Sequence, residues 1–149
     1  MKPPAWRFER AIYPFSFRLQ TRYRDQDHLG HVNNIALAAY YDEARHRFTA
    51  GEVFRRVGDI TGVRIVTADS HVHYLAEVFH PDELEIGSGI LKIGNASYQI
   101  GQALFQNGRC AGVCTTTFVQ ATAKGTSRLP DRVRAVLQDF LIAAPAEAG

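Results

Sequence analysis

Residues 25–34 read Asp-Gln-Asp-His-Leu-Gly-His-Val-Asn-Asn, and the apolar run Ile-Ala-Leu-Ala-Ala-Tyr-Tyr follows at residues 35–41. Asn33 or Asn34 can cap a helix, so the sequence predicts a helix over residues 34–50. A helix N-terminus gathers unpaired backbone N–H groups and partial positive charge. The two carboxylates and two imidazoles of the stretch therefore precede a position that stabilises developing negative charge.

The predicted helix changes character along its length. Residues 35–41 are apolar on all sides, and a helix of this kind is normally buried on all sides. The second half carries Glu43 and Arg45, so we expect it to emerge into solvent, with Gly51 as its end. A helix that is half buried in this way needs another element to wrap it.

Downstream patterns predict that the wrapping element is an antiparallel sheet. Alternation of apolar and polar residues predicts a first strand before the helix, and Asn107-Gly108 is a strong signal for a type I′ hairpin. An amphipathic pattern near the end of the chain predicts a helix over about residues 130–142. The expected strands are 15–23, 63–78, 83–93, 96–106 and 109–120, with a turn at His80-Pro81-Asp82 and a tight hairpin turn at Gly94-Asn95.

Composition limits the class of protein. The chain has 149 residues and a net charge of +2, which fits one domain (1–149, core about 13–122) and gives no reason to expect nucleic-acid binding. No signal peptide or membrane-spanning stretch is visible, so we expect a cytoplasmic protein without a membrane partner. Cys110 and Cys114 lie too far apart along one strand for a disulfide, and are expected to be free thiols on the same side of the sheet.

Two segments carry a resemblance to a known family. Residues 23–34 contain the pattern Asp-x-Asp-x-x-Gly-His-x-x-Asn, and residues 40–45 read Tyr-Tyr-Asp-Glu-Ala-Arg. Together they resemble the 4-hydroxybenzoyl-CoA thioesterase-like branch of the hot-dog superfamily. The resemblance implies an α+β hot-dog fold, in which a curled antiparallel sheet wraps a long central helix. Here a C-terminal amphipathic helix is added.

The resemblance also implies an active site. It places the catalytic carboxylate on Asp27, which would act as nucleophile or general base toward a thioester carbonyl. It assigns polarisation of that carbonyl to the backbone N–H near Asn34, while the Asn34 side chain is expected to serve as a cap. The residues expected to bind substrate are Gly30, His31 and Tyr41. Gly30 would allow close approach of the loop or adopt a positive φ, and His31 could also order the loop.

Other polar residues receive alternative roles. Asp25 is expected to shape the loop, and Glu43 and Arg45 to form a solvated or inter-subunit salt bridge, with Glu43 a secondary catalytic candidate. His71 and His73 have a spacing that can chelate, yet nothing completes a ligand set, so no metal is expected. Coenzyme A is expected only as part of the substrate, and no other cofactor is. Candidate contacts for its phosphates are Lys92, Arg109, Lys124 and Arg128.

The leading functional hypothesis is a thioesterase that hydrolyses an acyl-CoA or acyl-carrier-protein thioester. A hot-dog enoyl-CoA hydratase or dehydratase is the second, although the motif lacks the proline and the residue order of that branch. A non-catalytic acyl-binding protein is the third. A curled sheet leaves an edge strand and an open cleft. The resemblance implies that edge-to-edge dimerisation closes both, with the site at the subunit interface, so we expect a homodimer or homotetramer.

Overall fold

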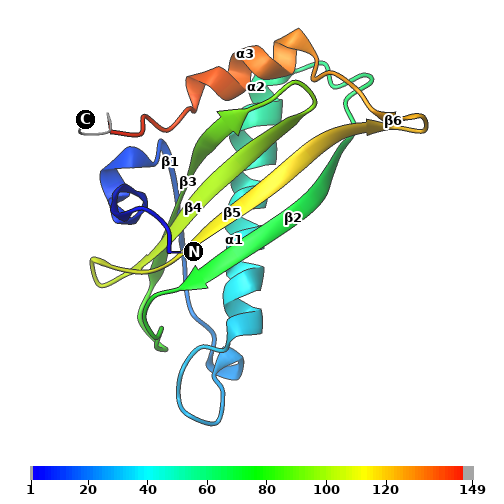
Figure 1. Ribbon diagram of the computed structural model, residues 1–149. Helices are drawn as coiled ribbons and strands as arrows, with labels where there is room; N and C mark the ends of the chain where they lie inside the picture. The colour runs from blue at the N-terminus through cyan, green and yellow to red at the C-terminus, as the bar shows by residue number, and fades with distance from the viewer. Residues whose placement is uncertain (1, 146–149) are drawn as a thin grey trace.

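The computed structural model describes residues 2–145. A long helix, α1 (Asn34–Phe48), lies against one face of a curled antiparallel sheet, and α3 (Asp131–Asp139) crosses one end of the sheet (Figure 1). The strand order is β1-β3-β4-β5-β2, and the short β6 pairs with β5. The predicted α+β architecture is confirmed. The strands are β1 (Phe15–Leu19), β2 (Ile65–Tyr74), β3 (Leu84–Ile93), β4 (Ser97–Gln106), β5 (Arg109–Thr122) and β6 (Gly125–Thr126).

Predictions made from local turn chemistry agree closely with the structure. Asn107 and Gly108 both adopt positive φ, 53° and 77°, as a type I′ hairpin requires. The strand predicted over 15–23 stops earlier, at Leu19, because the chain turns into a 3-10 turn at Tyr23–Asp25. The strand predicted over 63–78 is also shorter, and a bulge between Thr67 and Asp69 interrupts its pairing with β5.

The end of the central helix was predicted wrongly. The helix does not stop at Gly51 but continues through a π-helical stretch, Thr49–Phe54, into α2 (Arg55–Val57). Phe48 and Val53 are both fully buried in one cluster, and the wider turn keeps both side chains on the core side although they lie five positions apart. Packing therefore favours continuation, and the helix ends at Gly58, whose φ is +77°.

The expectation that the first half of α1 is buried on all sides is also wrong for this chain. The sheet covers one face of the helix, which includes Tyr40 and Tyr41, because a curled sheet of this width wraps only one side. Ile35 is 84% exposed, and Ala38 and Ala39 are exposed as well. An apolar stripe is thus left open beside the start of the helix.

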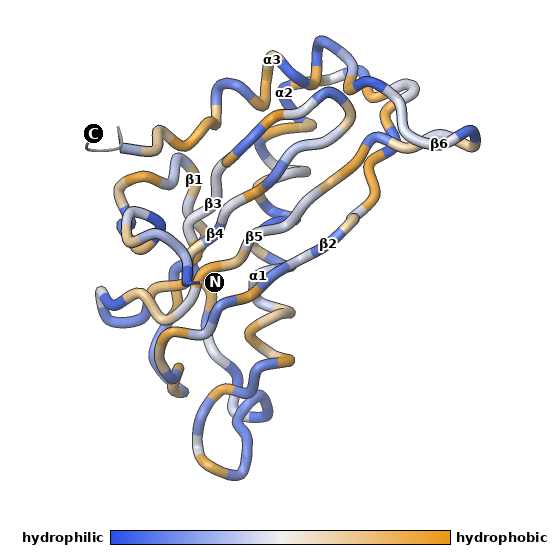
Figure 2. The backbone as a smooth tube through the Cα atoms, in the orientation of Figure 1, coloured by the Kyte–Doolittle hydropathy of each residue, from blue (hydrophilic) through white to orange (hydrophobic). Residues whose placement is uncertain are grey.

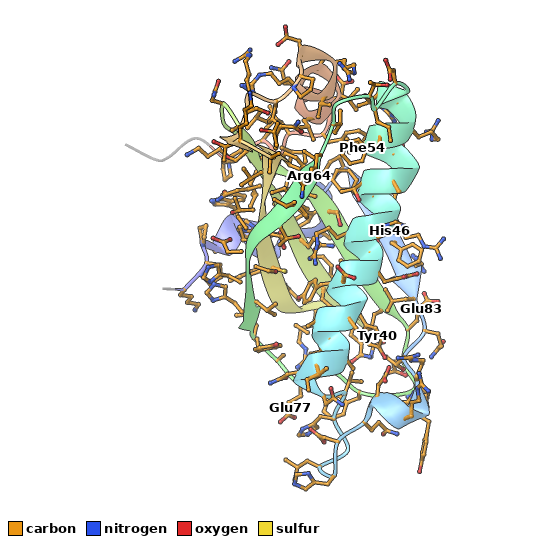
Figure 3. The ribbon with its side chains drawn as sticks, turned by 90° about the vertical axis from the view of Figure 1, so that its right-hand side faces the viewer. Tyr40, His46, Phe54, Arg64, Glu77 and Glu83 are labelled. Atoms are coloured by element: carbon orange, nitrogen blue, oxygen red, sulfur yellow. The ribbon has the colours of Figure 1, made fainter. Side chains whose placement is uncertain are left out.

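The face of the sheet opposite α1 is covered by residues 5–13 and by Ile142. Two 3-10 turns, Ala5–Phe8 and Arg10–Ile12, lie on this convex face, where Tyr13 packs with Phe105, Val113 and Ile142. Figures 1 and 3 both place this segment on the far side of the sheet from α1.

The two cysteines are free, as predicted, but they do not share a side of the sheet. Cys114 packs in the cluster under α1, whereas Cys110 packs in the cluster on the convex face. The pairing of β4 with β5 shifts register between Leu104 and Phe105, and this bulge reverses the alternation of side chains along β5.

Candidate active site

The loop that precedes α1 is tied to itself and to the chain after β2. The Asp27 N–H donates to the His31 carbonyl at 2.7 Å, and the Val32 N–H donates to the Val78 carbonyl at 2.8 Å. Figure 2 shows this loop as mostly hydrophilic beside the start of α1. These bonds hold polar side chains at the helix N-terminus against a segment that is distant in sequence.

Asp25 is the buried member of the two acids, at 8% exposure. Its carboxylate accepts hydrogen bonds from the Arg22 guanidinium at 2.8 and 3.2 Å and from the Tyr40 hydroxyl at 2.5 Å. The bond from Arg22 lowers the pKa of Asp25 below its ordinary value. Its backbone carbonyl accepts from the Asn33 N–H at 2.9 Å. This geometry supports the predicted role of Asp25 in shaping the loop.

Asp27 is held differently. Its Oδ1 accepts the backbone N–H groups of His31 at 3.1 Å and Leu29 at 2.9 Å. These bonds, that from His31 first, lower the pKa of Asp27, so its carboxyl group is ionised at neutral pH. Within residues 2–145 no group donates a hydrogen bond to Oδ2. Asp27 is therefore a charged, fixed carboxylate with one oxygen free to react.

The cap of α1 is Asn33 and not Asn34. The Asn33 side chain accepts the Ala36 N–H at 2.7 Å, so the expectation that the Asn34 side chain serves as a cap is wrong. Asn34 is the first helical residue, and its backbone N–H has no acceptor in the described part of the chain. An unpartnered amide at a helix N-terminus can stabilise an oxyanion.

A cleft of about 410 Å³ brings these groups together. Its far wall is the segment that follows β2, in which Glu77 pairs with the His31 imidazole at 3.2 Å. Figure 3 shows Glu77 beside the N-terminal end of α1. Sequence reasoning missed this wall, because nothing local marks residues so far from the motif. The lining residues are Asp27, His31, Val32, Asn34, Leu37, Tyr74, Leu75, Ala76, Glu77 and Val78.

Two of the predicted substrate-binding residues lie outside this lining. Gly30 adopts a φ of +84°, as the prediction allowed, and sits at the exposed tip of the loop. Tyr41 is 2% exposed and packs in the core between α1 and the sheet. The structure gives Tyr41 a packing role in place of the predicted substrate contact, because its position on α1 faces the sheet.

The helix residues Glu43 and Arg45 differ in how far their side chains are exposed to solvent. Glu43 is exposed and pairs with Arg47 at 3.1 Å, away from the cleft. Arg45 is not a solvated residue, since its side chain is 12% exposed. It donates to Gln102 at 3.1 Å while its pair with Asp42 reaches solvent.

The predicted phosphate contacts divide between the two ends of the molecule. Arg109 donates to the backbone carbonyl of Glu77 in the cleft wall. Lys92 lies near the end of β3, Lys124 in the turn between β5 and β6, and Arg128 donates to Asn95 in the turn between β3 and β4. The ends of β3 and β5 that carry or adjoin these three residues lie at the opposite end of the sheet from the N-terminus of α1 (Figure 1).

Neither a metal-ligand cluster nor a membrane-spanning helix is present in residues 2–145. No group of three or more His, Cys, Asp or Glu side chains in that range could hold a metal ion, so His71 and His73 lack a further ligand of these types. No helix in the same range is long and apolar enough to cross a membrane.

Comparison with solved structures gives close matches over most of the chain. A thioesterase of Thermus thermophilus, whose structure holds coenzyme A and zinc, is 27% identical, with a TM-score of 0.73 over 86% of this chain and 94% of that one. The PA5185 protein of Pseudomonas aeruginosa is 29% identical, with a TM-score of 0.74 over 91% and 96%. A 1,4-dihydroxy-2-naphthoyl-CoA thioesterase of Synechocystis, 15% identical over 85% and 96%, shares the fold at a TM-score of 0.71.

Comparison with sequences gives one clear result. A search of curated proteins found no significant match. The model of the thioesterase-like superfamily, however, matches residues 21–141, which include the motif, the central helix and the whole of the sheet beyond β1. The chain therefore belongs to the thioesterase-like superfamily and is a thioester hydrolase.

Proposed function

We propose that this protein hydrolyses an acyl-CoA thioester to the free acid and coenzyme A, with Asp27 as the reacting carboxylate. One observation carries the proposal. The free Oδ2 of an ionised Asp27 and the unpartnered N–H of Asn34 belong to the same cleft. A carboxylate that acts as nucleophile or base, together with an oxyanion donor, is one set of groups that can hydrolyse a thioester.

The arrangement fits two routes. In the first, Oδ2 of Asp27 attacks the thioester carbon, the C–S bond breaks, and the thiolate leaves with formation of a mixed anhydride, which water then hydrolyses. In the second, the carboxylate takes a proton from water, the hydroxide adds to the carbon, and the proton passes to the departing thiolate. In both routes the Asn34 N–H stabilises the charge on the carbonyl oxygen.

Coenzyme A is the favoured carrier of the acyl group, and no other cofactor is proposed. The Thermus relative binds coenzyme A, and the Synechocystis neighbour is named for a CoA thioester. Acyl-carrier protein remains the alternative carrier. An assay of the same acyl group on both carriers separates them, and faster turnover of the carrier-protein substrate would contradict the choice of coenzyme A.

We also propose that two copies of the chain associate. The stripe that contains Ile35 is apolar and open, and β2 is an edge strand of ten residues whose outer side pairs with no strand of residues 2–145. Exposed strand edges and apolar patches of this kind are usually covered by a partner. A second copy seated on β2 would also close the cleft, whose wall continues directly from that strand.

The test measures thiol release from a panel of acyl-CoA substrates. Asp27→Asn should lower kcat by about 10²–10⁴-fold, as expected for loss of a catalytic acid–base or nucleophilic group. Glu43→Gln is the matched control, since Glu43 is an exposed carboxylate outside the cleft, and it should retain wild-type kcat. Full activity of Asp27→Asn would remove Asp27 from the reaction. Hydration of an enoyl-CoA without thiol release would contradict hydrolysis itself.

A further inference from the structure

A buried cation on the convex face of the sheet has no counter-ion among residues 2–145. Arg7 is 6% exposed. Its guanidinium donates to the Tyr13 hydroxyl at 3.3 Å, to Thr115 Oγ1 at 3.0 Å and to the Cys114 carbonyl at 3.1 Å. All three acceptors are neutral, and no carboxylate of residues 2–145 forms an ion pair with Arg7. Buried charges in proteins are normally paired, so the Arg7 guanidinium is expected to bind an anion.

The surroundings of Arg7 form a basic hollow of about 420 Å³. Segment 2–7 supplies one wall, and the outward side chains of β2 supply the other. His71 and His73 point to this convex face because side chains alternate along a strand, and Val72 packs on the opposite, α1-facing side. The lining contains four basic residues and no acidic one. It consists of Lys2, Pro3, Pro4, Arg7, His71, His73 and Thr115.

The nearest acid on β2 does not neutralise this hollow. Asp69 lies two positions before His71, on the same side of the strand, but it is not part of the lining and pairs with none of the described cations. The ends of the Lys2, His71 and His73 side chains make no hydrogen bond within residues 2–145. The polar ends of these three side chains are therefore available to an external ligand.

We propose that this hollow binds a phosphate group. A guanidinium has five N–H donors, and three of those on Arg7 are engaged with the protein, which leaves two for a ligand. The Lys2 ammonium and the imidazoles add further donors around the same space. Phosphate oxygens are the acceptors that such a set binds most strongly. Inorganic phosphate and the phosphate of a larger ligand share this chemistry.

The site is distinct from the catalytic cleft. Tyr74 lines the cleft, whereas its neighbour His73 lines the hollow, so the two sites lie on opposite faces of β2. Segment 2–7 also precedes residue 21, where the match to the superfamily begins. Four of the seven lining residues of the hollow therefore lie outside the range that the superfamily model matches.

The test is a titration with inorganic phosphate, followed by calorimetry and by the amide resonance of Thr115. We expect saturable binding to wild type and to Asp27→Asn. The variant Lys2→Gln/His73→Gln should weaken binding at least about tenfold, the loss expected when one charge-assisted hydrogen bond disappears. The control Arg64→Gln/His46→Gln removes an exposed arginine and an exposed histidine from outside the hollow, and should bind like wild type.

Neither variant changes a fully buried side chain, and equal thermal midpoints would show that both fold. Absence of saturable binding to wild type, or equal affinities of wild type and Lys2→Gln/His73→Gln, would overturn the proposal. Displacement of bound inorganic phosphate from the Asp27→Asn protein by a competing ligand then identifies the source of the phosphate. Displacement by coenzyme A but not by its 3′-dephospho form supports the 3′-phosphate as the ligand. If neither coenzyme A nor its 3′-dephospho form displaces inorganic phosphate, the result supports a free phosphate ion as the ligand.

Discussion

Replacement of Asn34 by proline isolates the backbone amide that we assign to the oxyanion. Asn34 is the first residue of α1, where proline is well tolerated because its N–H is unpaired in any case. The preceding residue, Asn33, has φ −72° and ψ 159°, an extended conformation that a following proline favours. Asn34→Pro therefore deletes one N–H and breaks no hydrogen bond of the described chain.

The expected magnitudes for activity and stability differ sharply. Removal of one oxyanion donor lowers kcat by about 10²–10³-fold in enzymes that stabilise such a charge. The free energy of unfolding should change by less than about 0.5 kcal/mol, as for other surface substitutions. Steady-state thiol release gives kcat and KM, and circular dichroism melting gives stability.

Two control variants separate the amide from the side chains around it. Asn34→Ala keeps the N–H and should have wild-type kcat, because the Asn34 side chain does not cap the helix. Asn33→Ala removes the cap on the Ala36 N–H, so it should lower stability by about 1 kcal/mol and the melting temperature by about 2–4 °C. Wild-type kcat in a folded Asn34→Pro variant, or equal losses in the proline and alanine variants, would refute the assignment.

Three other predictions concern the loop and the surface. Asp25→Asn should destabilise the fold by about 1–3 kcal/mol at pH 7 through loss of the charged bond to Arg22. The pKa of Asp25 is lower in the folded state than in the unfolded state. The ionised Asp25 therefore stabilises the fold fully above the unfolded-state pKa of about 4, and this stabilisation is lost as the pH falls through the folded-state pKa. The free energies of unfolding of wild type and Asp25→Asn, measured in urea, should therefore converge at acid pH. A difference that stays constant with pH would contradict the ion pair. Gly30→Ala should cost about 1–2 kcal/mol from its φ of +84° alone, since the added Cβ would meet no described atom within 4 Å outside residues 29–31. An unchanged urea midpoint would contradict this. Ile35→Asp should shift the mass in light scattering from dimer or tetramer to monomer, whereas Ile60→Asp, at a site 55% exposed and outside the stripe, should not; a wild-type monomer would contradict association altogether.

The parts of the fold that sequence predicted well are those fixed by local chemistry. Asn107-Gly108 determines its hairpin because few other residue pairs tolerate positive φ at both positions. The periodicity of α3 determines its buried face in the same local way, with Val133 and Leu137 fully buried. Bulges such as that between Thr67 and Asp69 arise from cross-strand pairing and leave no local signal.

The same distinction explains the error at the end of the helix. Gly51 and Gly58 are both plausible helix ends by composition, and only the burial of Phe48 and Val53 makes the chain pass the first glycine. The candidate site also contains residues that the local sequence predicts and residues that it does not. The motif located Asp27 and the helix N-terminus, but Glu77 reaches the cleft through the path of the sheet, which is a property of tertiary structure.

The two acids of the motif show why pKa alone does not identify a reactive group. Hydrogen bonds lower the pKa of both Asp25 and Asp27, so both are charged at neutral pH. Their acceptor atoms differ. Both oxygens of Asp25 are engaged by Arg22, and one of them also by Tyr40, whereas both bonds to Asp27 fall on Oδ1. Access to the cleft separates the two acids further, because Asp27 lines the cleft whereas Asp25 is 8% exposed and does not. Asp27 is therefore the carboxylate that we propose as the reacting group, and Asp25 holds the loop that positions it.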